Sequence, residues 1–174
     1  MSPYDLTQLA WIGLGSNLGD RDATLDAALS GLASLSLCAP LCSPRYLSPP
    51  WGVTDQPSFI NQVVGIAPRP PLEASELLES LLRLEASLGR IRGRRWGPRT
   101  LDLDLLAWGA RVVQTERLTL PHPRLCERRF VLEPWAQLAP ELTLPGFDRP
   151  LVALLEGCAD LGELTQRKKR QLEG

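Results

Sequence analysis

The sequence predicts an α+β sandwich, in which helices pack on a mainly antiparallel sheet. Strand and helix patterns follow one another in the order strand, helix, strand, strand, helix, strand up to residue 108. This order is typical of a ferredoxin-like fold, which carries its helices on one face of the sheet and leaves the other face open. The chain has 174 residues, 44% of them hydrophobic and 22% charged. We therefore expect one domain over residues 1–174, with an extra C-terminal helical segment and a charged tail from about residue 160.

The first half of the predicted sheet begins with an apolar run over residues 8–14, which indicates a buried strand. Asp20 or Asp22 can cap the helix that follows, because apolar residues recur there at helical spacing. Residues 35–48 favour a second strand, and the prolines at positions 49 and 50 predict a loop after it.

The second half repeats this pattern. Residues 59–67 favour a strand, and leucines at helical spacing predict a helix over residues 72–88. A loop rich in glycine and arginine leads into an alternating strand over residues 100–108. Farther on, residues 130–138 and 150–155 favour short helices, and the basic tail predicts a charged helix or a frayed end.

Composition excludes several classes of protein. The net charge is −1, and the only two lysines are Lys168 and Lys169. A P-loop or a pyridoxal Schiff base would need a lysine in the body of the domain. The four cysteines show no C-x-x-C spacing and His122 is the only histidine, so a zinc site is not expected. The sequence shows neither a signal-peptide pattern nor an apolar run of the ~20 residues that span a membrane. We therefore expect a cytoplasmic protein with reduced cysteines.

The strand over residues 100–108 carries two carboxylates. Asp102 and Asp104 alternate with leucines, so both side chains should lie on one face of the strand. One interpretation is the polar face of a half-exposed strand. The other is a pair of ligands for divalent cations, because like charges on one face repel each other unless a cation lies between them.

The loop before this strand is unusually basic. Five arginines lie within ten residues that contain no acidic residue: Arg90, Arg92, Arg94, Arg95 and Arg99. One interpretation of this run of charge is a solvated surface. The other is a phosphate-binding loop, because guanidinium groups bind phosphate oxygens through pairs of hydrogen bonds. An arginine loop that leads into a carboxylate pair is the arrangement that phosphoryl transfer needs.

Three further patterns are weaker. The glycines Gly13, Gly15 and Gly19 follow a strand and precede a helix, but their spacing differs from that of dinucleotide-binding loops. Phe59 and Asn61 place a ring and an amide on one strand face, where they could pack in the core or bind the edge of a planar heterocycle. His122 could be a structural loop residue or a phosphate contact.

Sequence blocks over nearly the whole chain resemble those of the 6-hydroxymethyl-7,8-dihydropterin pyrophosphokinase family. The most specific block reads Trp96-Gly97-Pro98-Arg99-Thr100-Leu101-Asp102-Leu103-Asp104. The matching blocks cover residues 13–20, 56–61, 88–90, 95–106, 120–124 and 128–130. The resemblance implies a ferredoxin-like α+β fold and a transfer of pyrophosphate from ATP to the hydroxymethyl group of the pterin, with release of AMP, in folate biosynthesis.

The resemblance also implies roles for individual residues. Asp102 and Asp104 match the ligands of two Mg²⁺ ions, and Arg90, Arg92 and Arg99 act with them in catalysis. The residues that match the pterin pocket are Ser48, Pro49, Trp51, Phe59, Asn61, Trp96 and Phe130. Those that match ATP contacts are Glu85, Arg90, Arg92, Arg95, Arg99, Leu105, Arg117, Thr119, His122 and Arg128.

The alternative function is a nucleic-acid-binding module, because open sheets of this kind often bind RNA and an arginine loop is present. Such sheets carry clustered aromatic residues, whereas this chain has three Phe, two Tyr and an isoelectric point near 5.9. We therefore expect small-molecule substrates, no nucleic-acid or membrane partner, and a monomer.

Overall fold

The computed structural model describes residues 4–50, 52, 54–90 and 98–168. A long sheet is formed by β1 (Ala10–Ser16), β2 (Leu41–Cys42), β3 (Arg45–Ser48), β4 (Phe59–Ile66), β5 (Asp102–Trp108) and β8 (Thr165–Arg167). Within the described ranges its order is β5-β1-β4-β3-β8, with β2 also paired to β4, and the pairs are antiparallel. A separate two-stranded ribbon joins β6 (Val113–Gln114) and β7 (Thr119–Leu120). Because β5, β1, β4 and β3 lie in the order of a ferredoxin-like sheet, the predicted α+β fold is confirmed.

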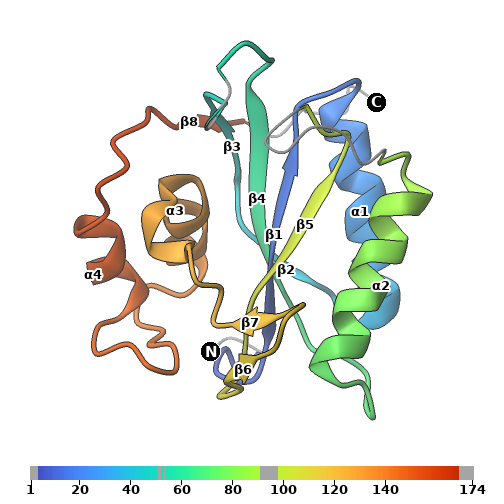
Figure 1. Cartoon of the computed structure of the whole chain (residues 1–174), viewed down its shortest axis with the longest axis vertical. Coiled ribbons are helices and arrows are strands. Elements are labelled where there is room, and N and C mark those ends of the chain that lie inside the picture. The colour runs from blue at the N-terminus through green and yellow to red at the C-terminus, as the bar shows by residue number, and fades with distance from the viewer. Residues whose placement is uncertain (1–3, 51, 53, 91–97, 169–174) are drawn as a thin grey trace.

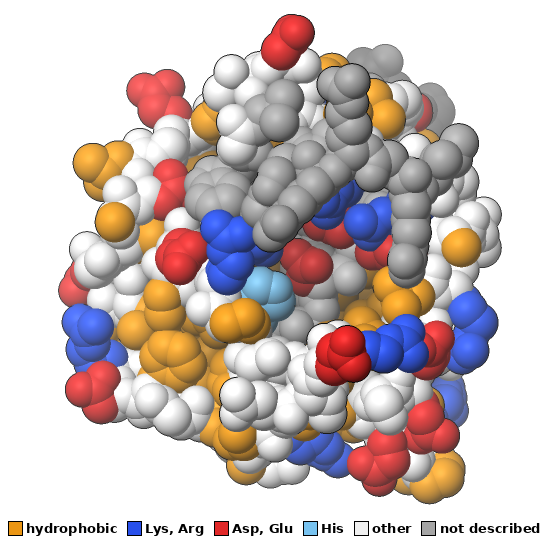
Figure 2. All heavy atoms as spheres, viewed as in Figure 1, with side chains coloured by type: hydrophobic (Ala, Val, Ile, Leu, Met, Phe, Trp, Pro, Cys, Tyr) orange, Lys and Arg blue, Asp and Glu red, His pale blue; other side chains and the backbone are white. Residues whose placement is uncertain are grey.

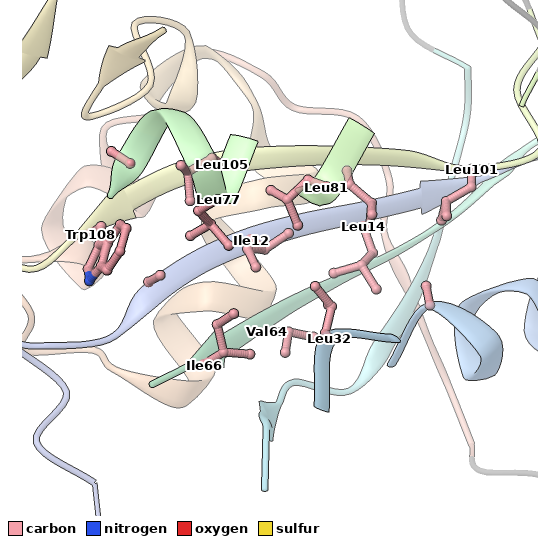
Figure 3. Packing of buried hydrophobic residues seen from close by; sticks show 14 of the residues in the cluster. Ile12, Leu14, Leu32, Val64, Ile66, Leu77, Leu81, Leu101, Leu105 and Trp108 are labelled. Atoms are coloured by element: carbon pink, nitrogen blue, oxygen red, sulfur yellow. The ribbon is translucent and has the colours of Figure 1, made fainter. Parts of the chain in front are cut away.

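Two helices, α1 (Arg21–Leu35) and α2 (Ala74–Ser87), pack on one face of this sheet (Figure 1). Asp20 caps α1, since its Oδ1 accepts a hydrogen bond of 3.1 Å from the Ala23 backbone N–H. Between these helices and the sheet lies a core of aliphatic side chains that includes Ile12, Val64 and Leu81 (Figure 3). This burial is the main source of stability for the layer.

The opposite face is only partly open, which corrects the expected open face. Helices α3 (Arg129–Leu138) and α4 (Leu151–Glu156) cover the half of this face that lies toward the start of β1 (Figure 1). Trp135 of α3 packs on Trp11 of β1 with ring centroids 5.7 Å apart. The apolar face of α3 needs a partner, and the sheet supplies it. Among the described residues, no helix covers the other half of the same face.

A β-bulge separates the two halves of β5. The pairing with β1 shifts between Trp11 and Ile12, so that Leu106 has no direct partner. Leu106 and Ala107 therefore both face α3, whereas Leu103 and Leu105 face α1 and α2. As predicted, Asp102 and Asp104 share the face opposite the leucines.

Two predicted elements differ in the structure. The single strand expected over residues 35–48 is broken into β2 and β3 around Ser43 and Pro44, because proline has no backbone N–H to donate. The tail expected as a helix or frayed end instead forms β8, which pairs with β3. An ion pair of 3.1 Å between Arg167 and Asp22 supports this strand, and the pairing covers the exposed edge of β3.

The helices predicted over residues 130–138 and 150–155 correspond to α3 and α4, whereas the β6–β7 ribbon was not predicted. The short helix η1 (Leu125–Glu127) precedes α3, and the predicted helix over residues 72–88 is α2. In the part of the chain that the structure describes, no helix is long and apolar enough to cross a membrane.

Candidate active site

The uncovered half of the sheet's second face forms a cavity of about 270 Å³. Strands β1, β4 and β5 form its floor, and the end of β3 and the start of α3 form its walls. The lining residues are Gly13, Leu14, Gly15, Ser48, Pro49, Phe59, Asn61, Gln62, Val63, Arg99, Asp102, Asp104, Arg128, Phe130 and Val131. A concave, mixed polar and apolar surface of this kind is typical of small-molecule sites.

Glycines make the floor of the cavity. Gly15 pairs with Asp102 on one side and with Asn61 on the other, and Gly13 lies in the next row, beside Asp104. Side chains that are directly opposite in a sheet share a face, so the glycines leave empty space between the carboxylates and the amide. The sequence analysis noted these glycines only as a weak match to dinucleotide-binding loops. Their spacing of two within a strand is the signal that could have shown their position.

Three arginines surround the carboxylate pair. Asp102 accepts hydrogen bonds from Arg90 at 2.8 Å and from Arg99 at 2.9 Å, one to each carboxylate oxygen. Arg128 lies 3.3 Å from Asp104 on the other side of the cavity. The guanidinium groups around the two carboxylates provide positive charge that can bind the anionic groups of a ligand. In the view of Figure 2, acidic and basic side chains lie close to the histidine near the middle of the molecule.

The two carboxylates differ in their electrostatic environment. Burial, and then the neighbouring charge of Asp102, raise the pKa of Asp104 from 3.8 to about 7. The arginines oppose this shift only in part. A second negative charge is therefore unfavourable here unless more positive charge is present. Two carboxylates that repel each other at the floor of a cavity are suitable oxygen ligands for a hard divalent cation.

Glu85 connects α2 to the strand that carries the carboxylates. Its buried side chain accepts a hydrogen bond of 2.7 Å from the Leu103 backbone N–H and lies 2.5 Å from Arg90. Burial raises the pKa of Glu85, whereas these two partners lower it. By holding Leu103 between the two aspartates, Glu85 fixes the position of β5 against α2.

The opposite side of the cavity is suited to a flat ring. Asn61 is buried, and its Nδ2 donates a hydrogen bond of 2.5 Å to Ser48 Oγ. A Cβ placed on Gly15 would lie 3.2 Å from Asn61 Oδ1, so this oxygen faces the floor. Phe59 and Phe130 add aromatic surface. An amide between two rings can bind the edge of a heterocycle while the rings contact its faces.

Asn17 is a residue whose role the sequence reasoning missed. Its Oδ1 accepts a hydrogen bond of 2.8 Å from the backbone of Arg99, and its own backbone donates to the Arg99 carbonyl at 3.1 Å. Its Nδ2 donates to Gln56 and Pro57 at 3.0 Å. Asn17 therefore joins three segments and positions Arg99 beside the cavity. The available signal was an asparagine directly after the first predicted strand.

His122 lies near the site on the same face (Figure 2). Its backbone N–H donates to the Leu106 carbonyl at 2.7 Å, and its Nδ1 accepts from the Arg124 N–H at 3.1 Å. Burial first, and then the charges of Arg128 and Arg124, lower the pKa of His122 to about 4. The ring is therefore neutral at pH 7 and carries its proton on Nε2, which leaves it a hydrogen-bond donor.

Some of the predicted ATP contacts lie apart from the cavity. Leu105 is buried in the core beneath α1 and α2. Arg117 is exposed and pairs with Glu79 of α2 at 2.6 Å, and Thr119 lies in β7. The predicted site residues Trp51, Arg92, Arg95 and Trp96 are outside the described residues.

The family model for 7,8-dihydro-6-hydroxymethylpterin-pyrophosphokinase (HPPK) matches residues 11–140, three quarters of the chain. The chain belongs to this family. A 2-amino-4-hydroxy-6-hydroxymethyldihydropteridine pyrophosphokinase of Methylorubrum extorquens is 47% identical over 138 residues, which are 79% of this chain and 86% of the relative. The enzyme of the same name from Pseudomonas aeruginosa is 41% identical over 154 residues, 88% of this chain and 93% of the relative.

Solved structures support the HPPK fold. The HPPK-DHPS of Plasmodium falciparum superposes with a TM-score of 0.67 at 12% sequence identity, covering 90% of this chain. This chain spans only 45% of that longer chain. At such low identity the likeness concerns the fold alone.

Proposed function

We propose that this chain transfers pyrophosphate from ATP to the hydroxymethyl group of 6-hydroxymethyl-7,8-dihydropterin and releases AMP, a step of folate biosynthesis. The observation that carries the proposal is the register across β1. It places the Asp102–Asp104 pair on one side of a glycine floor and Asn61 on the other. One side suits phosphate groups and cations, and the other suits a planar heterocycle. Membership of the HPPK family supports the same reaction.

The pterin would lie on the side of Asn61. Phe59 and Phe130 would contact its faces, and Asn61, held by Ser48, would bind its polar edge. Because Asn61 Nδ2 already donates to Ser48, its Oδ1 would accept from an N–H of the ring. Pro49 completes this wall, and the predicted contributions of Trp51 and Trp96 stay predictions.

The phosphates would lie on the side of the arginines. Arg90, Arg99 and Arg128 are held at the carboxylate pair, where they would bind phosphate oxygens. For Arg92 and Arg95 the same role stays a prediction. For the nucleotide itself we propose contacts with Glu85, Leu105, Arg117, Thr119 and His122, through backbone atoms in the case of the buried Leu105.

The carboxylate pair fits Mg²⁺. Asp102 and Asp104 present hard oxygen ligands at the cavity floor, and burial and mutual repulsion make a second negative charge unfavourable there. We propose that they hold two Mg²⁺ ions. When bound, the ions would neutralise phosphate charge and lower the pKa of a coordinated hydroxyl group.

Catalysis by the chain itself would consist of positioning and charge stabilisation. The pterin hydroxyl oxygen would attack the β-phosphorus of ATP in line, and the bond from the β-phosphorus to the α–β bridging oxygen would break. Asn61 would orient the ring that carries the hydroxyl group. Arg90 and Arg99 would bind the phosphate oxygens on which negative charge develops in the transition state.

The product nucleotide tests the proposal. The purified chain, incubated with ATP, Mg²⁺ and the reduced pterin alcohol, should form AMP in an amount equal to the diphosphorylated pterin. Formation of ADP would refute the transfer of pyrophosphate. Omission of Mg²⁺, with a chelator present, should stop the reaction and tests the metal separately.

No finding favours the alternative of a nucleic-acid-binding module. That function requires an accessible sheet face, and α3 and α4 cover half of the face in question. A monomeric, cytoplasmic chain of one domain stays a prediction.

A further inference from the structure

The chain after α4 returns to the active site along an unexpected path. From Cys158 to Lys168 it runs past the start of α3 and ends as β8 at the edge of the sheet (Figure 1). We call residues 158–168 the C-terminal strap. The match to the HPPK family model ends at residue 140, so the strap lies outside the matched region.

The strap is attached at both of its ends. At its beginning, Cys158 Sγ lies 3.3 Å from the Cys126 carbonyl oxygen, in the short helix directly before Arg128. At its end, β8 pairs with β3, and Arg167 forms an ion pair of 3.1 Å with Asp22. The two anchors therefore lie beside the two walls of the cavity: η1 directly precedes α3, and the paired part of β3 directly precedes Ser48 and Pro49.

Asp160 makes the central contact of the strap. Its Oδ2 accepts a hydrogen bond of 3.1 Å from the Arg129 backbone N–H, and its Oδ1 accepts one of 2.9 Å from the Gly162 N–H. Arg129 is the first residue of α3, and the N-cap residue Arg128 supplies no side-chain cap. The carboxylate of Asp160 therefore acts as a cap delivered from a distant part of the chain, where a negative charge is also favourable.

Gly162, whose N–H donates to Asp160, lies near the opposite wall. A Cβ placed on Gly162 would lie 3.0 Å from Asp160 Oδ1 and 4.0 Å from Pro49 Cγ. Pro49 lines the cavity on the β3 side, and Phe130, in the first turn of α3, lines it on the other. Asp160 is thus bonded to one wall, and its hydrogen-bonded neighbour Gly162 lies near the other.

We infer that Asp160 is a positioning residue for the pterin: by capping α3 at the Arg129 N–H and holding Gly162 near Pro49, it sets the separation between Phe130 and Pro49. This inference rests on the proposed function, because it concerns the same cavity. ATP depends on it less, since of the three arginines at the carboxylate pair only Arg128 adjoins the capped end of α3. Arg90 and Arg99 are held from the other side by Glu85, Asp102 and Asn17.

The test measures the two ligands separately. Calorimetry should follow the binding of a non-hydrolysable ATP analogue with Mg²⁺, and then of 6-hydroxymethylpterin to that complex. In Asp160→Ala the dissociation constant for the pterin should rise about fivefold to tenfold, the range typical of a lost capping bond. That for the ATP analogue should change at most about twofold. Asp160→Asn keeps one acceptor oxygen and should fall between wild type and Asp160→Ala.

Two further variants complete the design. Asp148→Ala is the matched control, because this aspartate is 94% exposed and pairs only weakly with its neighbour Arg149, at 3.7 Å. Gly162→Ala keeps the Asp160 carboxylate but displaces it, because the new Cβ would lie 3.0 Å from Asp160 Oδ1. This variant should raise the dissociation constant for the pterin about twofold to threefold. It keeps the test decisive if Asp160→Ala does not fold.

The outcomes are distinct. The inference is overturned if Asp160→Ala and Gly162→Ala both bind the pterin as tightly as Asp148→Ala does. It is also overturned if Asp160→Ala loses equal affinity for the pterin and for the ATP analogue. If the wild-type chain itself binds no pterin, the proposed function fails instead.

Discussion

Replacement of Asp104 by Asn would separate the catalytic role of the carboxylate pair from its cost to stability. The variant keeps the shape of the side chain and removes one of two neighbouring negative charges. In the metal-free protein we expect Asp104→Asn to be more stable than wild type at high pH, although it should be inactive.

The direction follows from the pKa of Asp104, which rises from 3.8 to about 7 on folding. Between about pH 4 and 7 the folded state holds a proton that the unfolded state has released, so the free energy of unfolding falls as pH rises through this window. The loss of stability caused by ionising Asp104 is complete above about pH 7 and absent below about pH 4. The Asn side chain does not titrate, so the variant lacks this dependence.

The magnitude depends on how exposed the group is. A shift of about three units corresponds to roughly 4 kcal/mol for a group without solvent screening. Since 35% of the Asp104 side chain is exposed, we expect a smaller effect, on the order of 1–2 kcal/mol at pH 8.

Urea unfolding with a chelator, at pH 4 and at pH 8, measures this difference. Asp102→Asn is the control. It loses charged partners at Arg90 and Arg99, which lie 2.8 and 2.9 Å away, and should not gain stability. The reasoning is refuted if Asp104→Asn differs from wild type by the same amount at both pH values. It is also refuted if the variant keeps more than about a tenth of the wild-type kcat, equivalent to roughly 1.4 kcal/mol of barrier.

Three other predictions concern the cavity. Asn61→Ala should weaken pterin binding by about 1–3 kcal/mol, because an N–H donor of the ring loses its acceptor, and should leave ATP binding nearly unchanged. Calorimetric titration with each ligand separately tests this. Equal losses of affinity for pterin and ATP would mean that Asn61 has a structural role. Gly15→Ala should weaken pterin binding, because its Cβ would lie 3.2 Å from Asn61 Oδ1. The Cβ of Gly13→Ala would contact Leu106 at the ordinary distance of 3.6 Å, so this variant should keep the thermal stability of the wild type. A loss of thermal stability in Gly13→Ala would contradict this packing. Since the pKa of His122 is lowered to about 4, its NMR ring signals should not titrate between pH 5.5 and 7.5, and a midpoint near 6.5 would show that the ring is solvated.

The sequence predicted the local features of the site better than its three-dimensional assembly. The alternation of Asp102 and Asp104 with leucines depends only on strand geometry, so their common face could be stated in advance. That Asn61 lies two strands away in the same row depends on the register of β4 against β1. A register is a long-range property, which local patterns do not determine.

The covered half of the sheet shows the same limit. The pattern over residues 130–138 predicted a helix correctly, but not that Trp135 would pack on Trp11 and close part of the face. Likewise, the charge of the tail suggested a helix or a frayed end, whereas the free edge of β3 gave this segment a strand partner. In both cases the decisive partner is distant in sequence.

The β-bulge in β5 marks the position at which this strand can lose a residue without reversing its side chains. Leu106 is the one extra residue against β1, and it lies between the half that carries the aspartates and the half that packs under α3. Because Leu105 and Ala107 already pair with the adjacent residues Ile12 and Trp11, deletion of Leu106 would remove the bulge and leave the aspartates and Trp108 on their present faces. Deletion of Leu103 would instead make Asp102 and Asp104 neighbours in the strand, which would put the two carboxylates on opposite faces.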